Sequence, residues 1–523
     1  MDWPPAPKPA QDRAFEFVET PACQRALRCW KSACDDESLD IWAELAAAEP
    51  DNLYSLSLAA RAYGERFRLE DTERLAEQIR ALGPRCAMVH QTIGDIHGSV
   101  GFPERAQRDY QTAASCPDAG PDTLLALAAC MERARRFDEA RSLIERAERG
   151  RPAVPQALLL KARIHRQEKE FASADATLAN LIGRAPGSSE ILVEAVGELA
   201  LLRDRQGDYD AAFDVIGRAK AIHLGRCQAQ RAASDHVTHR FATLVDSVTP
   251  DDFARWQADS PVPGGEPRPA LLTGFPRSGT TLMEQVLDAH PGIVSSEEKD
   301  VIARGVLPAM HDGLTANDPL AAVLDRLTPE RIREHRQFYW RVLETFAGEK
   351  FGTRTHFDKN PAYNLLIPFF IRLFPEARLL VAVRDPRDIL LSCYLRYLPL
   401  NPVSVTFLTL ESTAHRYALD MTGWLKFSDM ISNPWIEVRY EDLVGDLGGE
   451  ARRICQLLEL PWDPELLDYR KKLEGKSIAS PTYADVRKPI YRSSIGRWKH
   501  YEKHLERQFE VLAPYIDAFG YSP

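Results

Sequence analysis

A proline recurs about every 34 residues through the amino-terminal half of the chain and constrains its fold more than any other feature. The intervals are 34, 33, 35 and 34 residues, and the prolines are Pro50, Pro84, Pro117, Pro152 and Pro186. The sequence between them is rich in alanine and leucine, which favours helices. Because proline cannot continue a helix interior, each one is expected to end the second helix of a pair. The pattern predicts a solenoid of stacked helix pairs.

A second set of residues keeps the same period. Small residues spaced by 34 positions each follow an aromatic residue, and the pairs are Phe102 and Ala106, Phe137 and Ala140, and Phe171 and Ala174. Tyr209 and Ala212 repeat the pattern after a small insertion, whereas Thr72 stands where the first alanine is expected. A small residue lets paired helices approach closely, and the aromatic ring fills the space beside it. A nonrepetitive helical domain is the alternative interpretation.

This spacing resembles the tetratricopeptide repeat family over residues 18–222, with five or six degenerate helix pairs, and Gly94 matches the family's first-helix glycine. The resemblance implies an all-α solenoid whose concave surface binds a peptide or a partner protein. Fold alone does not establish that role. Residues 1–17 are expected to form an amino-terminal tail.

Composition narrows the class of protein. The chain has 523 residues, of which 44% are hydrophobic and 27% charged, values typical of folded, multidomain proteins. Its formal net charge of −10 argues against general binding to nucleic acid or to anionic membranes. Nine thinly spread cysteines, an odd number, favour free thiols. The first residues lack the apolar core of a secretory signal, and the longest apolar stretch, residues 365–374, contains Arg372. These features predict a cytoplasmic protein that is neither exported nor inserted into a membrane.

A turn-rich joint separates the two halves of the chain. Residues 223–267 are expected to form a helical connector that ends in ADSPVPGGEPRP, whose glycines and prolines mark a domain boundary. A new domain is expected over residues 268–523.

A glycine-containing loop follows the first apolar segment of that domain. The segment PALLTGF reads as a buried strand and leads through Gly274-Phe-Pro-Arg-Ser-Gly279 into a helix-patterned stretch. Such a turn aims backbone N–H groups and the positive end of a helix dipole at an anion. The spacing of the glycines copies a Walker A loop, but Thr280 stands where a nucleotide hydrolase carries lysine.

The string PRSGTT after a strand resembles the 5′-phosphosulfate loop of the sulfotransferase family, which uses 3′-phosphoadenosine-5′-phosphosulfate (PAPS). The resemblance implies a P-loop-like α/β domain with a mostly parallel sheet, strands near residues 270, 293, 354, 380 and 436, and ligand loops at their carboxyl ends. The alternation of strand and helix patterns supports this fold. The loop residues that the resemblance assigns to the donor are Arg277, Ser278, Gly279, Thr280 and Thr281.

A second motif tests the resemblance. In ARLLVAVRDPRDILLSCYLR, a strand ends at Arg384 and Ser392 follows on the next helix. This pair resembles the family's 3′-phosphate site, where a guanidinium and a hydroxyl hold a phosphate that ATP lacks. A surface ion pair with Asp385 or Asp388 is the alternative interpretation of Arg384.

Catalytic candidates follow from the same resemblance. Lys359 resembles the family lysine near the bridging oxygen of PAPS, with a solvated lysine as the alternative. Pro361 stands where the cytosolic branch of the family has its catalytic histidine, so the general base must be another residue. The residues around Glu297 and Glu298 resemble the tyrosylprotein sulfotransferase branch, in which an acidic residue at the second position is the base, and this resemblance implies Glu298 rather than Glu297. A charged helix start is the alternative for the glutamates. Asp300 departs from that branch, which carries arginine there.

The carboxyl-terminal segment adds weaker candidates. Tyr440 follows a strand and is placed near the adenosine by the resemblance, and Arg487 or Lys488 is placed near the 3′-phosphate. Plain packing and solvated charge are the alternatives for these three residues.

The sequence therefore predicts a PAPS-dependent sulfotransferase, closest to the tyrosylprotein branch and bacterial in origin. Arg277, Glu298 and Lys359 are its expected catalytic residues, with no metal. The acceptor is a hydroxyl, with a protein or peptide tyrosine, a glycan and a small molecule as candidates, and the solenoid binds the acceptor or a partner. A P-loop kinase or nucleotidase and a noncatalytic repeat scaffold are the alternative functions. The oligomeric state is not readable from the sequence.

Overall fold

The chain forms two compact units in the computed structural model of the protein. The first unit contains Met1–Leu160 and Ala303–Ala309, and the second contains Lys161–Ile302 and Met310–Pro523. The residues that the structure describes are 18–32, 36–152, 154–185, 189–260, 262, 264–311, 314, 317–473, 490 and 492–522. The division after Leu160 falls inside the stretch expected to form one solenoid, so the domain boundaries drawn from the sequence stay a prediction.

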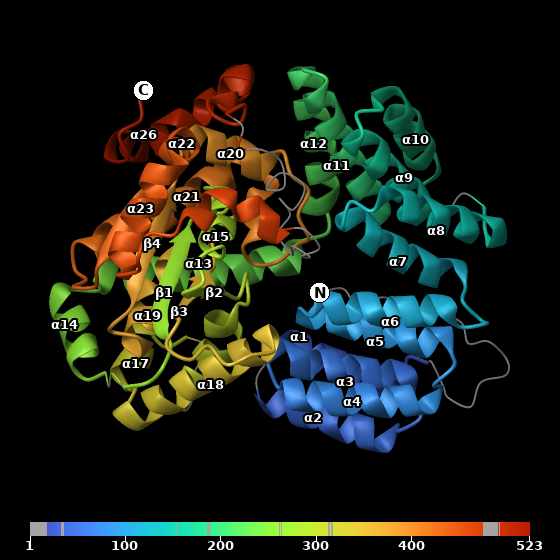
Figure 1. The fold of residues 1–523 in the computed structure, drawn as a ribbon, viewed down its shortest axis with the longest axis horizontal. Helices are drawn as coiled ribbons and strands as arrows, with labels where there is room; N and C mark the ends of the chain where they lie inside the picture. The colour runs from blue at the N-terminus through green and yellow to red at the C-terminus, as the bar shows by residue number, and fades with distance from the viewer. Residues whose placement is uncertain are drawn as a thin grey trace. The chain divides into compact units, whose positions relative to one another are not determined.

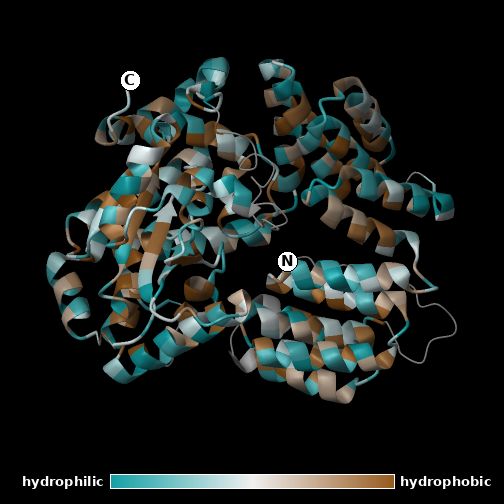
Figure 2. Ribbon diagram, viewed as in Figure 1, coloured by the Kyte–Doolittle hydropathy of each residue, from teal (hydrophilic) through white to brown (hydrophobic). Residues whose placement is uncertain are grey.

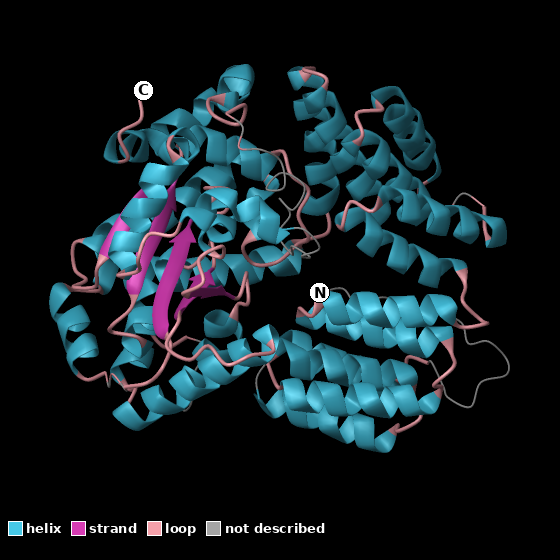
Figure 3. Ribbon diagram, viewed as in Figure 1, coloured by secondary structure: helices cyan, strands magenta, loops and turns pink. Residues whose placement is uncertain are grey.

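Among the described residues, only helices precede the first strand, as the repeat pattern predicts (Figures 1 and 3). The helices of the first unit are α1 (Pro21–Ser32), α2 (Asp36–Ala48), α3 (Leu53–Glu65), α4 (Leu69–Leu82), α5 (Ala87–Val100), α6 (Pro103–Ser115), α7 (Pro121–Arg133) and α8 (Phe137–Gly150). Pro50, Pro84, Pro117 and Pro152 lie just after α2, α4, α6 and α8, at the end of the second helix of each pair. Pro186 lies outside the described residues.

A left-handed residue recurs at the turn inside the helix pairs. The residues with positive φ at these turns are Phe67, Gly101, Arg135, Lys169 and Gly207. The residue after each one donates its N–H to a carbonyl five positions earlier, as Arg136 does to Met131 and Glu170 does to His165, both at 2.8 Å. This Schellman arrangement satisfies a carbonyl at the end of the first helix. The turns are 34 residues apart except for the last, which confirms the repeat period and places the insertion in the last pair.

The small residues of the repeat face into the helix pairs. Ala106, Ala140, Ala174 and Ala212 are all buried. A Cβ added to Gly94 of α5 would lie 2.6 Å from Cε1 of Tyr110 on α6, so the two helices pack too closely for a larger residue.

Thr72 occupies the position where the first alanine was expected, and it too is buried. Its hydroxyl donates to the carbonyl of Ala60 at 3.2 Å, which satisfies the polar group inside the pair.

The short segment Ala303–Ala309 belongs to the first unit although it lies far along the chain. Arg66 Nη1 donates to the carbonyl of Arg304 at 3.2 Å, and Arg304 Nη2 donates to the carbonyl of Glu65 at 3.4 Å. The Arg304 guanidinium lies 5.7 Å from the ring centre of Phe67. These contacts hold the segment against the turn between α3 and α4.

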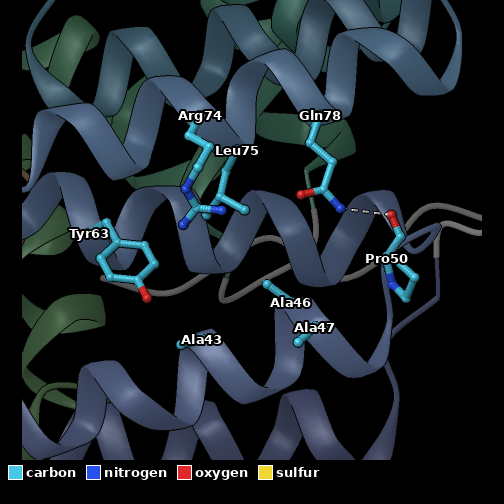
Figure 4. Close-up of a pocket in the computed structure, with 8 residues that line it drawn as sticks. All are labelled: Ala43, Ala46, Ala47, Pro50, Tyr63, Arg74, Leu75 and Gln78. Atoms are coloured by element: carbon cyan, nitrogen blue, oxygen red, sulfur yellow. Dashed lines mark hydrogen bonds between the residues drawn. The ribbon is translucent and has the colours of Figure 1, made fainter.

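A cavity of about 210 Å³ opens in the first unit between α2, α3 and α4 (Figure 4). Its lining residues are Ala43, Ala46, Ala47, Pro50, Tyr63, Arg74, Leu75 and Gln78. Gln78 Nε2 donates to the carbonyl of Pro50 at 3.2 Å across one end. None of the predicted site residues lines this cavity.

The helical sequence continues from the division into the second unit. The helices before the first strand are α9 (Pro155–Gln167), which spans the division, α10 (Phe171–Arg184), α11 (Glu190–Arg205), α12 (Tyr209–Leu224), α13 (Gln228–Ser247) and α14 (Pro250–Ala258). The last two occupy the expected connector. Thr249 caps α14, since its hydroxyl accepts from the Asp252 N–H while the Asp252 carboxylate accepts from the Thr249 N–H.

A five-stranded parallel sheet forms the centre of the α/β part, as the sequence predicts. Its strands are β1 (Arg268–Gly274), β2 (Ile293–Ser295), β3 (Thr355–Lys359), β4 (Arg378–Val383) and β5 (Trp435–Arg439). The strand order is β2-β3-β1-β4-β5, so β1 lies in the middle of the sheet. Leu272 pairs with Lys359 on one side and with Leu380 on the other. Figure 2 shows hydrophobic residues along β1 and β4, which agrees with the burial of these two strands.

The remaining helices lie between the strands or after them along the chain. They are α15 (Thr280–Leu287), the π-helix η1 (Ile302–Val306), α16 (Leu307–Met310), α17 (Leu320–Asp325), α18 (Pro329–Ala347), η2 (Asn364–Leu366), α19 (Ile367–Leu373), α20 (Pro386–Tyr394), η3 (Ser404–Leu408), α21 (Leu410–Ser428), α22 (Tyr440–Gly445), α23 (Leu447–Leu458), η4 (Pro464–Leu473), η5 (Arg497–Tyr501), α25 (Glu502–Leu505), η6 (Glu506–Gln508) and α26 (Phe509–Ala518). One buried cluster joins the sheet to α15 and α23 through Leu272, Leu287, Phe357, Leu380 and Ile454. This packing fixes α15, and with it the loop that precedes the helix.

The repeated turns generate a stability prediction. Replacing Gly207 by alanine should lower the free energy of unfolding by about 1 kcal/mol, because a Cβ is strained at a φ of 81° while no neighbouring atom is within 4 Å. Replacing Lys169, whose φ is 65°, by glycine at the equivalent turn should have the opposite sign. Urea denaturation of both variants measures the difference. Equal destabilisation by the two substitutions would contradict the assignment of these turns.

Candidate active site

The predicted motifs meet at one edge of the sheet because the strands that precede them are parallel. The glycine-containing loop leaves β1, the two glutamates follow β2, and Lys359 ends β3. Arg384 directly follows β4, and Tyr440 directly follows β5. Strand ends thus bring together residues that are far apart in the sequence.

The loop between β1 and α15 has an unusual backbone. Gly274, Arg277 and Gly279 have φ angles of 143°, 78° and 102°. A Cβ on Gly274 would lie 2.3 Å from the carbonyl oxygen of Ala382, and a Cβ on Gly279 would lie 2.5 Å from Cδ2 of Tyr440. Both glycines are therefore required by close packing against the neighbouring motifs as well as by their φ angles.

The hydroxyl groups of the loop are enclosed. Ser278, Thr280 and Thr281 are buried, and α15 begins at Thr280. Ser278 Oγ has no hydrogen-bond partner among the described residues. A buried hydroxyl without a partner at the start of a helix is suited to an anionic ligand. The residues of the loop therefore fit a phosphate group.

Arg277 and Ser392, from different motifs, contact each other. Arg277 Nε donates to Ser392 Oγ at 3.0 Å. The Arg384 guanidinium reaches the same loop, because its Nη1 donates to the carbonyl of Arg277 at 3.2 Å. The predicted phosphate loop and the predicted Arg384/Ser392 pair thus form one cluster.

Arg384 is largely buried, with 7% of the residue exposed. Its Nη2 donates to the carbonyl of Ser494 at 2.5 Å, and its guanidinium lies 4.8 Å from the ring centre of Tyr440. Its Nη2 is 3.7 Å from Asp388 Oδ2, and its Nε has no hydrogen-bond partner in the described part of the chain. Because Arg384 is buried, the alternative interpretation of this residue as part of a surface ion pair does not fit.

Asp388 ties the carboxyl-terminal segment to this cluster. Its two oxygens accept the N–H groups of Gly496 at 2.7 Å and Trp498 at 2.9 Å. Burial raises the pKa of Asp388, although the charge of Arg384 and the two backbone hydrogen bonds oppose the shift.

Tyr440 lies between the loop and the carboxyl-terminal segment. Its ring contacts Gly279, as described above, and its hydroxyl shares a hydrogen bond with Ser494 Oγ at 2.8 Å. Arg487 and Lys488, which the sequence also places near the donor, lie outside the described residues.

Lys359 and Glu298 form an ion pair at the end of β3. Lys359 Nζ lies 2.6 Å from Glu298 Oε1, with 1% of the lysine side chain and 37% of the glutamate side chain exposed. Glu297, the alternative base, has a φ of 56° and donates its N–H to Ser295 Oγ at 3.3 Å. The burial of Lys359 does not fit a solvated lysine.

Glu284 is a member of this cluster that the sequence analysis missed. It lies on α15, is buried, and has its Oε2 3.2 Å from Lys359 Nζ. Ser295 donates its hydroxyl to the other carboxylate oxygen. The available signal was a single charged residue inside the otherwise uncharged stretch TTLMEQVL.

The two carboxylates set the charge of Lys359. Burial alone would lower the pKa of the ammonium group, but Glu284 and Glu298 more than reverse this effect and raise the pKa above its usual value. Lys359 is therefore positively charged at neutral pH, and it holds a carboxylate at the edge of the sheet where the glycine-containing loop begins.

Two further acids lie beside the cluster. Asp358 is buried and accepts hydrogen bonds from the Tyr339 hydroxyl at 2.7 Å and from Asn360 Nδ2 at 2.6 Å. Burial raises the pKa of Asp358 to about 7, against the effect of these two hydrogen bonds. Asp300, the departure noted in the sequence, accepts a hydrogen bond from the Tyr363 hydroxyl at 2.5 Å.

Among the described residues, no three or more histidine, cysteine, aspartate or glutamate side chains are grouped so that they could hold a metal ion. In the same residues, no helix combines the length and apolar character needed to cross a membrane.

Residues 269–464 match the sulfotransferase family. The α/β part of the chain is a sulfotransferase-family domain. Protein-tyrosine sulfotransferase 1 of Danio rerio is 26% identical over 268 residues, which cover 48% of this chain and 72% of that protein. An uncharacterized protein of Aquifex aeolicus is 25% identical over 321 residues, which cover 59% of this chain and 40% of that protein. This match spans well under two thirds of the Aquifex protein.

Among solved structures, the sulfotransferase domain from the Synechococcus PCC 7002 olefin synthase has 22% sequence identity and a TM-score of 0.32. The alignment covers 46% of this chain and 90% of that domain.

The sulfotransferase-family domain should show a pH-dependent stability that originates at Asp358. Because burial raises its pKa from 3.8 to about 7, the folded chain retains a proton that the unfolded chain has lost between these values. The stabilising effect of this proton is present below pH 3.8 and is lost as the pH rises through 7. Between these pH values the free energy of unfolding of wild type should fall relative to that of Asp358→Asn, which lacks the carboxyl group. The difference should grow by at most about 1.4 kcal/mol per pH unit and should level off above pH 7.

Urea denaturation between pH 4 and pH 9 measures this difference. Asp138→Asn makes the same chemical change at a fully exposed position and is the matched control. A difference between Asp358→Asn and wild type that does not change with pH would show that Asp358 is not buried in this way.

Proposed function

We propose that the protein transfers a sulfuryl group from PAPS to an acceptor hydroxyl. The observation that carries the proposal is the 2.6 Å pair of Lys359 Nζ and Glu298 Oε1 at the sheet edge that also bears the Gly274–Gly279 loop. A proton acceptor, a buried cation and a phosphate-binding loop are the parts that a direct transfer to a hydroxyl requires. The family of the domain supports the same class of reaction.

Two buried polar atoms of the site fit a nucleotide that carries phosphates at the 3′ and 5′ positions of its ribose. The buried Ser278 Oγ and Arg384 Nε have no protein partner among the described residues. In our proposal, Arg277, Ser278, Gly279, Thr280 and Thr281 hold the 5′-phosphosulfate. Arg384 and Ser392 hold the 3′-phosphate, and Tyr440 lies near the adenosine. Arg487 and Lys488 stay predicted contributors to the 3′-phosphate site.

The proposed reaction follows from these roles. Glu298 accepts the proton of the acceptor hydroxyl while the hydroxyl oxygen forms a bond to sulfur. The bond between sulfur and the 5′-phosphate oxygen breaks, and the products are a sulfate ester and adenosine 3′,5′-bisphosphate. Lys359 and Arg277 offset the negative charge that develops on the departing phosphate. Glu284 helps to keep Lys359 charged for this purpose. No metal is assigned to any of these steps, and its absence stays a prediction.

The acceptor is proposed to be a protein or peptide, with tyrosine as its candidate residue, because several relatives of the domain are named protein-tyrosine sulfotransferases. The helical repeats are proposed to bind that acceptor or a partner. The cysteines whose side chains the structure describes are free thiols, which suits the predicted cytoplasmic location.

Donor binding gives the first test. Calorimetry should show that adenosine 3′,5′-bisphosphate binds the protein and that ATP with magnesium binds much more weakly, since Thr280 replaces the Walker A lysine. Arg384→Ala should weaken bisphosphate binding at least about tenfold, a loss of about 1.4 kcal/mol. Arg453→Ala, which removes an exposed arginine paired with Glu450, should have no effect.

Preference for ATP would instead favour a P-loop kinase or nucleotidase. No nucleotide binding by the folded protein would favour a noncatalytic repeat scaffold.

The catalytic base gives the second test. Glu298→Gln should lower kcat by about 10²- to 10⁴-fold, because the amide cannot accept the proton of the acceptor. Glu297→Gln is the matched control and should keep most of the activity, since Lys359 Nζ donates its hydrogen bond to Glu298. The measurement is transfer of labelled sulfate from PAPS to tyrosine peptides. Inactivation by the Glu297 substitution with retention in the Glu298 variant would reverse the two assignments.

A further inference from the structure

One carboxylate of the helical repeats contacts the carboxyl-terminal segment of the transferase part. Asp204 lies in the last turn of α11, with 9% of its side chain exposed. It accepts a hydrogen bond from the Tyr501 hydroxyl at 2.7 Å and forms an ion pair with Arg497. An aspartate at this end of a helix faces the negative end of the helix dipole. Its charge therefore depends on these partners for compensation.

The segment that Asp204 holds also holds the proposed donor site. Arg497 starts η5, and the residues around it, Gly496 and Trp498, donate their N–H groups to Asp388. Two residues before Gly496, the carbonyl of Ser494 accepts from Arg384 Nη2, and Ser494 Oγ bonds with the Tyr440 hydroxyl. Residues 494–498 therefore contact Asp204 on one side and the arginine of the proposed 3′-phosphate site on the other.

We propose that Asp204 is a positioning residue for the 3′-phosphate site, so that the last helix pair of the repeats is part of the donor-binding machinery. This inference rests on the proposed function, because it assigns the 3′-phosphate to Arg384. Asp204 acts through Arg497, which fixes the short turn at Gly496. That turn presents two N–H groups to Asp388 and one carbonyl to Arg384, which together set the direction of the guanidinium.

A second set of contacts ties the same helix pair to the other end of α20. Lys220 of α12 is 6% exposed, and its Nζ donates to the carbonyl of Arg396 at 2.9 Å and lies 5.7 Å from the ring centre of Tyr394. Phe213 packs against Tyr394 with ring centres 5.1 Å apart. Tyr394 ends α20 two residues after Ser392. The helix that carries Ser392 is thus held from α12, while the segment facing its first turn is held from α11.

The orientation of the guanidinium matters because arginine binds phosphate through a planar fork of N–H groups. An arginine that stays charged but turns away from this direction loses paired hydrogen bonds to the phosphate. In our proposal the groups that touch the 5′ end of the nucleotide belong to the loop after β1, and none of them belongs to residues 494–498. Loss of Asp204 should therefore affect recognition of the 3′-phosphate selectively.

The experiment compares two nucleotides in four forms of the full-length protein. Adenosine 3′,5′-bisphosphate and 5′-AMP differ in the 3′-phosphate, and calorimetry gives the ratio of their affinities. Asp204→Asn should weaken bisphosphate binding about tenfold and leave 5′-AMP binding unchanged. Asp204→Glu keeps the charge and should restore most of the ratio.

Asp210→Asn is the matched control. Asp210 begins the next helix and also pairs with the carboxyl-terminal segment, through Lys503 at 2.7 Å and His504 at 2.9 Å. These partners are outside the 494–498 turn, so the control should keep the wild-type ratio.

Amide hydrogen exchange adds a readout that needs no nucleotide. Asp204→Asn should speed exchange at Gly496 and Trp498, the two amides bonded to Asp388, and Asp210→Asn should not. Equal loss of both nucleotides, an unchanged ratio, or the same loss in the Asp210 variant would overturn the inference while the proposed function stands. Wild-type protein that fails to prefer the bisphosphate over 5′-AMP would overturn the proposed function itself, and the donor role of Asp204 with it.

Discussion

Because the five strands of the sheet run parallel, each loop that leaves a carboxyl end meets the others at the same edge. The candidate site depends on this constraint more than on any single contact. The loop after β1 has its present form because Gly274 packs beside Ala382 of β4 and Gly279 packs beside Tyr440. The register of β1 with β4 sets the first of these contacts, and β5 supplies the second. The sheet thus determines both where the loop lies and what it packs against.

Buried charge at this edge is balanced in two different ways. Lys359 is neutralised by carboxylates, with Glu298 and Glu284 on the same ammonium group. Arg384 relies mainly on backbone carbonyls, those of Arg277 and Ser494, and its nearest carboxylate oxygen is 3.7 Å away. A buried cation held by carbonyls retains more of its charge for an incoming anion than one already paired. This difference suits the proposed division between a reacting centre at Lys359 and a binding centre at Arg384.

The sequence predicted the parts of the molecule that local patterns control. The strand positions, the turn before α15 and the helix pairs follow from apolar periodicity, glycine spacing and proline spacing, and the structure agrees with all three. The role of Glu284 on α15 was not predicted, because it comes from the contact with Lys359, which lies far along the chain on β3. The left-handed turns at Arg135 and Lys169 were not predicted, because glycine is the residue that usually adopts this conformation. The division after Leu160 depends on contacts such as that of Lys220 with Arg396, which no local pattern reports.

The segment Ala303–Ala309 gives the first unit a discontinuous chain. Its packing partners, around Phe67, are made early during synthesis, but Arg304 leaves the ribosome only after more than 230 further residues. The first unit can therefore begin to fold during translation but cannot be completed until β1, α15 and β2 have all been made. Closing so long a loop carries an entropic cost that grows only slowly with length. The order of synthesis thus makes the last step of folding in the first unit wait for the first two strands of the α/β part.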